Sequence, residues 1–421
     1  MMQKVIQVEE RPPVKQLVPL SLQHLFAMFG ATVLVPILLK ADPATVLLLN
    51  GIGTLLYLFI CKGRIPAYLG SSFAFISPSL IVIQKFGFNA ALSGYIVSGL
   101  IFIVVALIIQ KVGTKWLDIV LPPAAMGAIV AVIGLELAPV AADMAGLTVN
   151  TFNPKSAIVS ITTLLITVFC SVALRGFLQI IPILIGVISG YILSGFLGIV
   201  DTSIIASAKW LQVPHFTFPS WNVEAILIIA PAALVVIAEH IGHLIVTANI
   251  VEKDLMKKPG LHLSLLGNGI STLISGFVGS TPNTTYGENI GVMAITKVYS
   301  VWVMGGAACF AIILSFIGKL AAAIQAIPTP VMGGVSLLLF GVIAASGIRM
   351  LVESKVDYSK PDNLILTSII LIVGISGAQI KIGAIALKGM ALAAIVGIIL
   401  SIVFYILNNG RKTNKNTSNG L

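Results

Sequence analysis

Fourteen apolar runs follow one another along this chain, and most approach the roughly 20 residues that a helix needs to cross a bilayer. Only 10% of the residues are charged whereas 57% are apolar, so the chain lacks the polar surface of a soluble, disordered or fibrous protein. We therefore expect an all-α integral membrane protein with 14 transmembrane segments joined by short loops. The runs lie near residues 19–39, 44–61, 68–84, 90–110, 123–142, 156–174, 179–198, 224–250, 260–278, 284–296, 300–317, 330–350, 363–378 and 386–407.

The distribution of lysine and arginine sets the expected orientation of these spans. An even number of spans places both termini on one side, where eighteen of the 25 basic residues then lie, against seven on the other. The positive-inside rule therefore predicts cytoplasmic termini. The basic residues that give the net charge of +10 are scattered singly between apolar runs. Their positions are explained by the orientation of the spans in the membrane, so no nucleic-acid partner is expected. Residues 1–16 lack the apolar core and cleavage site of a signal peptide, so the first span is expected to direct insertion.

Weak internal similarity indicates that the chain consists of two related halves. Pro, Met and Gly recur with the same mutual spacing at 122–127 and at 328–333, about 206 residues apart. Gln23-His24 in the first span is followed 216 residues later by Glu239-His240 in the eighth span. The two halves are offset by seven spans. Because seven is an odd number, the second half enters the membrane from the opposite side. Such a 7+7 inverted repeat is typical of secondary transporters, although a channel or a membrane enzyme can also contain repeats.

The third and tenth spans are interrupted at matching positions of the two halves. Residues 66–78 and 279–291 are rich in hydroxyl groups, glycine and proline where a lipid-facing helix would carry leucine. Non-helical backbone at membrane depth is tolerated only when it is buried in protein or lines a cavity. We expect residues 72–74 and 284–286 to pair as short strands, each leading into a half-helix whose N–H groups face a ligand. The alternative is two ordinary re-entrant kinks.

Three carboxylates lie within spans, where an ionisable side chain is costly: Glu136, Glu239 and Glu288. Glu136 lies near the outer end of the fifth span, where it either has a structural role or reaches water. Glu239 and His243 lie one helical turn apart on one face, which favours a shared proton and a role as proton carrier. The alternative is a structural hydrogen bond that locks a helix pair. The order Glu-His-x-x-His differs from the zinc-binding His-Glu-x-x-His, so no metal is expected.

Glu288 follows Gly287 at the interruption of the tenth span. Two carboxylates and unpaired backbone groups at one depth would form a hydrogen-bonding cavity for a small planar solute with N–H donors and C=O acceptors. No Arg or Lys lies deep in any span, which argues against phosphate, sulfate or carboxylate substrates.

Several segments resemble one transporter family. Residues 288–297 match the signature of the nucleobase–ascorbate (nucleobase–cation symporter-2) transporters, and Gln23-His24, residues 21–30 and residues 68–75 match as well. Glutamate rather than glutamine at 288 resembles the uracil branch more than the xanthine branch. Phe340 is a departure, since a close member of the family has tyrosine there.

The resemblance implies a core domain of residues 1–112 and 221–318 (spans 1–4 and 8–11). It also implies a gate domain of residues 113–220 and 319–421 (spans 5–7 and 12–14). It further implies a homodimer in the bacterial inner membrane that imports uracil together with a proton by alternating access, with no cofactor beyond the co-transported H⁺. Carried over by position, the side chains of Glu239 and Glu288 would hydrogen-bond uracil.

The remaining roles that the resemblance implies concern five positions. They are backbone hydrogen bonds to uracil from Phe73 and Gly287, proton coupling at His243, and pocket lining by Tyr286 and Ala31.

Three other functions are alternatives to uracil–proton symport. A proton-coupled symporter for xanthine or another purine would have the same fold. An uncoupled facilitator or channel would need a continuous polar lining, whereas the polar residues here gather at one depth. An intramembrane enzyme lacks support, because no nucleophile–base pair or metal motif is present in the sequence.

Overall fold

The computed structural model describes residues 5–150, 152–382 and 385–418, and most of them are helical. The helices and strands are α1 (Val14–Ala27), α2 (Phe29–Leu39), α3 (Pro43–Ile60), β1 (Leu69–Ser71), η1 (Phe73–Phe75), α4 (Ile76–Phe86), α5 (Phe88–Val112), α6 (Leu117–Val120), α7 (Pro123–Met144), α8 (Pro154–Ala173), α9 (Phe177–Ile180), α10 (Pro182–Phe196), α11 (Ser203–Ser207), α12 (Val223–Ile229), α13 (Ala232–Val251), η2 (Met256–Gly260), α14 (Leu261–Val278), β2 (Asn283–Thr285), α15 (Gly287–Thr296), α16 (Val301–Ser315), α17 (Gly318–Gln325), α18 (Thr329–Glu353), α19 (Pro361–Ile375), β3 (Gln379–Ile382), β4 (Ile385–Lys388) and α20 (Gly389–Ser418).

Each of the fourteen apolar runs coincides with a helix, with two successive helices, or with a strand followed by a helix. Among the described residues, eight helical segments are long and apolar enough to cross a membrane, and α1 with α2 makes a ninth, bent by 40°. Four shorter apolar helices add to these: Phe73–Phe86, Pro182–Phe196, Val301–Ser315 and Pro361–Ile375. The protein is therefore a multi-pass helical membrane protein, and the count of 14 spans stays a prediction.

The two interrupted spans meet as a pair of short antiparallel strands in the interior. β1 and β2 pair with Leu69 opposite Thr285 and Ser71 opposite Asn283. The expected strand at 72–74 is wrong by three residues, because Phe73–Phe75 forms a 3₁₀ turn instead. Ser72 donates the last ladder hydrogen bond to the carbonyl of Pro282, which has no N–H to return, so the ladder ends there.

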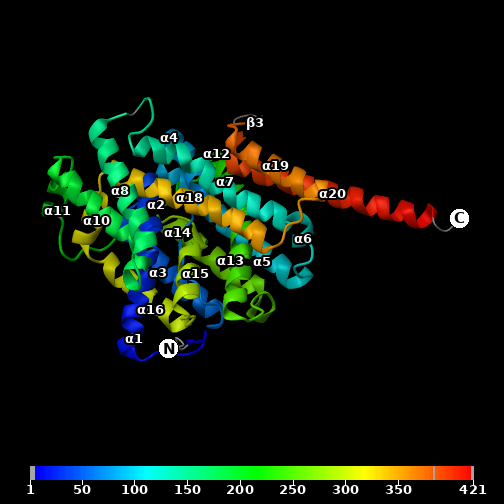
Figure 1. The fold of residues 1–421 in the computed structure, drawn as a ribbon, viewed down its shortest axis with the longest axis horizontal. Helices are drawn as coiled ribbons and strands as arrows, with labels where there is room; N and C mark the ends of the chain where they lie inside the picture. Colours follow the sequence, from blue (N-terminus) through cyan, green and yellow to red (C-terminus); the bar gives the residue numbers. More distant parts are fainter. Residues whose placement is uncertain (1–4, 151, 383–384, 419–421) are drawn as a thin grey trace.

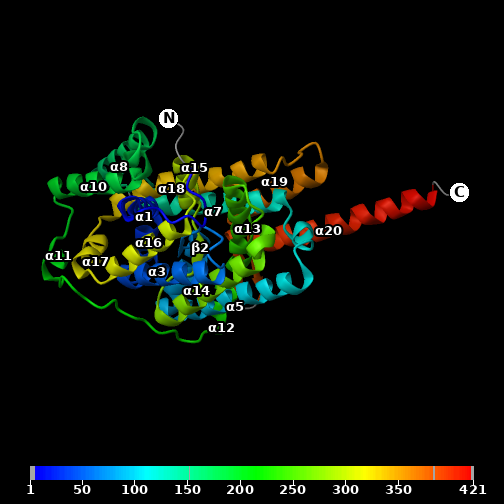
Figure 2. The same cartoon turned by 90° about the horizontal axis from the view of Figure 1, so that it is seen from below.

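The helices form two groups around this strand pair (Figures 1 and 2). In one group, α14 packs against α5 and α3, and α16 packs against α3 and α1. In the other, α7 packs against α18 and α19, α8 packs against α10 and α18, and α19 packs against α20. Glycines such as Gly134 and Gly347 allow α7 and α18 to approach closely, because a Cβ at either position would collide with the backbone of the other helix.

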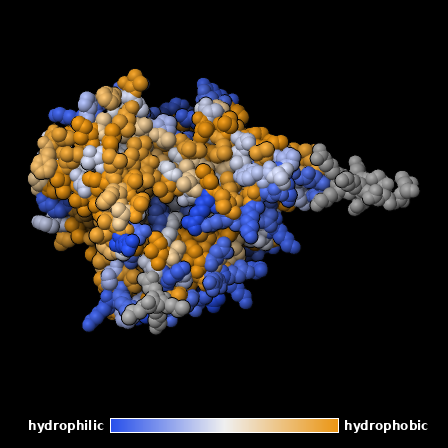
Figure 3. Space-filling model, in the orientation of Figure 1, coloured by the Kyte–Doolittle hydropathy of each residue, from blue (hydrophilic) through white to orange (hydrophobic). Residues whose placement is uncertain are grey.

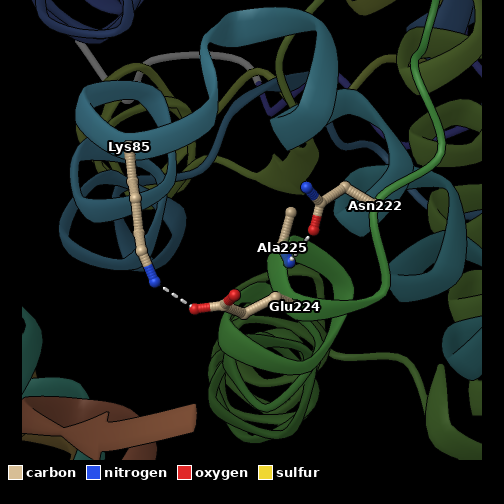
Figure 4. Close-up of polar contacts among 4 residues, drawn as sticks. All are labelled: Lys85, Asn222, Glu224 and Ala225. Atoms are coloured by element: carbon tan, nitrogen blue, oxygen red, sulfur yellow. Dashed lines mark hydrogen bonds and ion pairs between the residues drawn. The ribbon is translucent and has the colours of Figure 1, made fainter. Parts of the chain in front are cut away.

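An extended segment, residues 208–222, connects the two groups along one edge of the molecule (Figure 2). It is tied to helix ends by hydrogen bonds, for example from Thr45 Oγ1 to the carbonyl of His215 at 2.7 Å. At its end Asn222 caps α12, and an ion pair between Lys85 and Glu224 joins α4 to α12 (Figure 4). Apolar side chains cover much of the face drawn in Figure 3, as expected for a surface in contact with lipid.

Candidate functional site

Two threonines hold the outer edges of the strand pair. Thr54 of α3 accepts a hydrogen bond from the N–H of Leu69 at 2.9 Å and donates one to its carbonyl at 3.3 Å. Thr272 of α14 makes the same two bonds with Asn283, at 3.1 and 3.3 Å. Backbone groups away from water must be paired within the protein, so these hydroxyls make a strand pair possible at this depth.

Both threonines belong to a repeated motif that the sequence interpretation missed. Residues 50–54 read Asn-Gly-Ile-Gly-Thr and residues 268–272 read Asn-Gly-Ile-Ser-Thr, 218 residues apart. This offset is close to the 206 and 216 residues of the other repeated pairs, so the motif was a detectable signal. Two equivalent helices therefore make equivalent contacts with the two strands.

Tyr286 lies across the strand pair at the start of α15. Its N–H donates to the carbonyl of Tyr68 at 3.2 Å, and its hydroxyl donates to the carbonyl of Ser71 at 3.1 Å. A Cβ at Gly70 would collide with the Tyr286 ring, so the crossing requires glycine there. The expectation that Tyr286 belongs to this region is consistent with its burial beside both strands.

Glu239 and His243 face the second strand from α13. Glu239 is buried, with 9% of its surface exposed, and accepts a hydrogen bond from Thr284 Oγ1 at 3.4 Å. His243 Nδ1 lies 3.2 Å from Thr285 Oγ1, and its Nε2 lies 3.2 Å from the position that a Cβ of Gly287 would take. The carboxylate and imidazole therefore contact adjacent residues of β2.

Glu288 lies in the first turn of α15 and is half-buried. Its neighbour Gly287 lies against His243, so α15 begins beside the helix that also carries Glu239. The first N–H groups of a helix have no partner within the helix, and Gly287 and Glu288 occupy these positions in α15. The structure thus brings together both carboxylates, His243 and the start of a half-helix.

Ala31 and Phe73 complete the set of predicted site residues on the first half of the chain. Ala31 is buried in α2, three residues beyond the bend at Met28, and Phe73 opens η1 directly after the first strand. The Phe73 ring meets Phe340 of α18 edge to face, with centroids 5.9 Å apart. The departure at Phe340 therefore lies where the two groups of helices meet beside the strands.

Asn289 links the tenth span to the first. Its amide donates to Nδ1 and to the carbonyl of His24, both at 3.1 Å. The neighbouring Gln23 lines a cavity of about 1000 Å³ together with the N-terminal segment, the end of α15 and residues around α9. His24 of the Gln-His pair and Asn289 of the signature both match the resembled family, and in the structure they contact each other.

Glu136 contacts other elements. It accepts hydrogen bonds from Ser77 Oγ at 2.6 Å and from the N–H of Met390 at 2.8 Å. The carboxylate thus joins α4 to the N-terminus of α20, where a negative charge is favourable. Of the two roles left open for Glu136, the structural one is supported by these contacts.

Several buried polar atoms next to the strands have no hydrogen-bond partner among the described residues. Most buried polar groups in proteins are paired, so a cluster of unpaired ones indicates a place where a polar solute or water binds. No group of three or more His, Cys, Asp or Glu able to hold a metal ion is found in the described ranges. The unpaired atoms adjacent to the strands belong to Thr32, Tyr68, Ser72, Ser280, Asn283 and Asn289.

Comparison with known proteins places this geometry in context. Residues 15–383 match the model of the Permease family. The chain is 67% identical to the uracil permease of Escherichia coli strain K12, over 97% of this chain and 96% of that protein. It is 64% identical to the uracil permease of Paenibacillus larvae, over 99% of this chain and 100% of that protein.

A solved structure shares the fold at low sequence identity. The murine anion transporter Slc26a9, in its inward-facing state, superposes with a TM-score of 0.67 at 13% identity, over 95% of this chain and 69% of that one. This similarity shows the fold alone.

Proposed function

The chain belongs to the Permease family, and from this membership we propose that it is a proton-coupled symporter that imports uracil. Membership of a family of permeases makes the chain a transporter rather than an enzyme. The names of the curated relatives support uracil as the substrate. The geometry at the strand crossing supports the way in which uracil would be held.

The observation that carries the proposal is that Glu239 and His243 of α13 contact β2 directly before the start of α15, where Glu288 lies in the first turn. Uracil is planar and offers two N–H donors and two carbonyl acceptors. The acceptor-only carboxylates of Glu239 and Glu288 would receive the N–H groups. The backbone N–H groups of Phe73 and Gly287 would donate to the carbonyls, with Ala31 and Tyr286 lining the pocket. This set of donors and acceptors is complementary to a neutral pyrimidine.

Proton coupling would use the same residues. Two carboxylates close together in a site with little water repel each other, which favours a shared proton over two negative charges. His243 lies on the same helix face as Glu239 and contacts Thr285, so it would exchange that proton with the carboxylate. Proton and uracil would therefore bind together.

The proposed transport cycle moves one group of helices against the other. We assign residues 1–112 and 221–318 to a core domain, and 113–220 and 319–421 to a gate domain, in a 14-span, 7+7 inverted repeat. The repeated threonine motif and the Phe73–Phe340 contact between groups support this division. Inner-membrane location, cytoplasmic termini and a homodimer are further parts of the proposal.

Transport by purified protein in proteoliposomes tests both claims. Uptake of labelled uracil should need an inward proton gradient, and uptake unaffected by a protonophore would remove the symport claim. Unlabelled 5-fluorouracil should compete with uracil, because it keeps the same donors and acceptors. Displacement by xanthine but not by 5-fluorouracil or thymine would reassign the protein to purines.

A further inference from the structure

A second polar network lies beside the proposed site and joins α13 to α14 and α3. His240 Nε2 lies 2.8 Å from Ser264 Oγ of α14. The same Ser264 oxygen lies 2.6 Å from the hydroxyl of Tyr57 on α3. All three side chains are almost completely buried, so water does not compete for these hydrogen bonds. The three groups form a continuous chain from α13 to α3.

This chain leads from the depth of the site toward the cytoplasmic ends of the helices. His240 is next to Glu239 in the middle of α13, whereas Tyr57 is one turn from the last residues of α3. Beyond it, Cys61 lies beside the Tyr57 hydroxyl and ends the helix, and exposed Lys62 and Arg64 follow. A surface cavity of about 450 Å³, lined in part by Arg64 and Lys253, opens at this end.

One nitrogen of the His240 ring is available for a further hydrogen bond. Nδ1 is buried and has no hydrogen-bond partner among the described residues. The titratable groups that act on this part of the network are His243 on the same helix, and Tyr57 and Cys61 from α3. An imidazole bonded at one nitrogen and free at the other can take a proton on one side and release it on the other.

We propose that His240, Ser264 and Tyr57 form a relay through which the co-transported proton leaves the site for the cytoplasm. The inference rests on the proposed symport and adds an exit route to it. A proton arriving from the Glu239–His243 pair binds Nδ1 of His240 while the hydrogen on Nε2 passes to Ser264 Oγ. Ser264 then gives its own hydrogen to the Tyr57 oxygen, and the hydrogen that Tyr57 releases passes beside Cys61 to water at the exposed end of α3. Each group gains one proton and loses one. The hydrogen of His240 is then on Nδ1, so the starting state is restored by a change of tautomer at His240 together with rotation of the hydroxyls.

The alternative role of the network is structural, as a lock between α13, α14 and α3. Uracil exchange separates the two roles, because during exchange the carrier returns loaded and the proton need not leave. Loss of a relay group slows net proton-driven uptake but leaves exchange and uracil affinity unchanged. Loss of a structural lock weakens all three.

The test compares Tyr57→Phe with Tyr95→Phe in proteoliposomes under an imposed pH gradient. Both tyrosines are fully buried and each hydroxyl contacts a serine, at 2.6 Å for Tyr57 and at 2.8 Å from Tyr95 to Ser79. Tyr57→Phe should slow net uptake by about tenfold, because proton transfer then limits a cycle otherwise set by conformational steps. Tyr95→Phe should leave the ratio of net uptake to exchange at the wild-type value.

Two results would overturn the relay: net uptake by Tyr57→Phe that equals that of Tyr95→Phe, or an equal fall in uptake and exchange. If Tyr57→Phe does not fold, Ser264→Ala and Ser264→Thr provide the same comparison, since only threonine keeps the hydroxyl. Net uptake should fall in the alanine variant and recover in the threonine variant, and equal uptake by the two would refute the relay. Failure of the symport proposal is distinguishable, because wild-type uptake would then already be independent of the gradient.

Discussion

Replacing Thr272 by valine should destabilise the strand crossing while leaving its shape nearly unchanged. Valine has almost the volume of threonine, so no cavity forms, but both hydrogen bonds to the backbone of Asn283 are lost. These bonds are 3.1 Å long from the N–H and 3.3 Å long to the carbonyl. An unpaired buried group costs about 1–3 kcal/mol, and the carbonyl bond is the longer and weaker of the two, so we expect a loss of about 2–4 kcal/mol.

The measurement is thermal unfolding of the purified protein in detergent, followed by tryptophan fluorescence and compared as apparent melting temperatures. Thr54→Val should lower the melting temperature by a similar amount, because Thr54 makes the same pair of bonds with Leu69. The matched control is Thr167→Val, since that buried hydroxyl donates only to the carbonyl of Thr163 in its own helix. If Thr272→Val melts at the same temperature as the control, the hydroxyls do not hold the strand edges and the reasoning fails.

Three further substitutions test the site. Glu288→Gln turns an acceptor into an amide whose donors face those of uracil, so the Kd from equilibrium binding should rise by roughly tenfold or more, and an unchanged Kd would place Glu288 outside the pocket. Glu239→Gln should abolish proton-driven accumulation without reducing expression, measured as uptake against external pH; a wild-type pH profile would contradict its role. Gly70→Ala should lower both stability and binding because the new methyl meets the Tyr286 ring, whereas Gly291→Ala, with open space around it, should be neutral in the same assays.

Much of the site could be predicted because membrane burial makes polar residues conspicuous. Lipid excludes unpaired backbone and charge, so the Gly- and Pro-rich interruptions and the carboxylates at 239 and 288 stood out against apolar surroundings. The structure confirms a strand pair in the interrupted spans and brings Glu239, His243 and Glu288 to it. The strand boundaries were less accurate, because propensity alone favoured Phe73 in a strand.

What the sequence by itself determined is the class of protein and the depth at which its polar groups lie. A chain with so few charges can satisfy its backbone in lipid only as helices, and each interruption then has to be buried. Only the tertiary structure decided the partners: the ladder that ends at Pro282, the threonines on the strand edges, and Asn289 on His24. These contacts join residues that are mostly far apart along the chain or lie on different helices. Their distances depend on how helices pack through glycine, which no local pattern specifies.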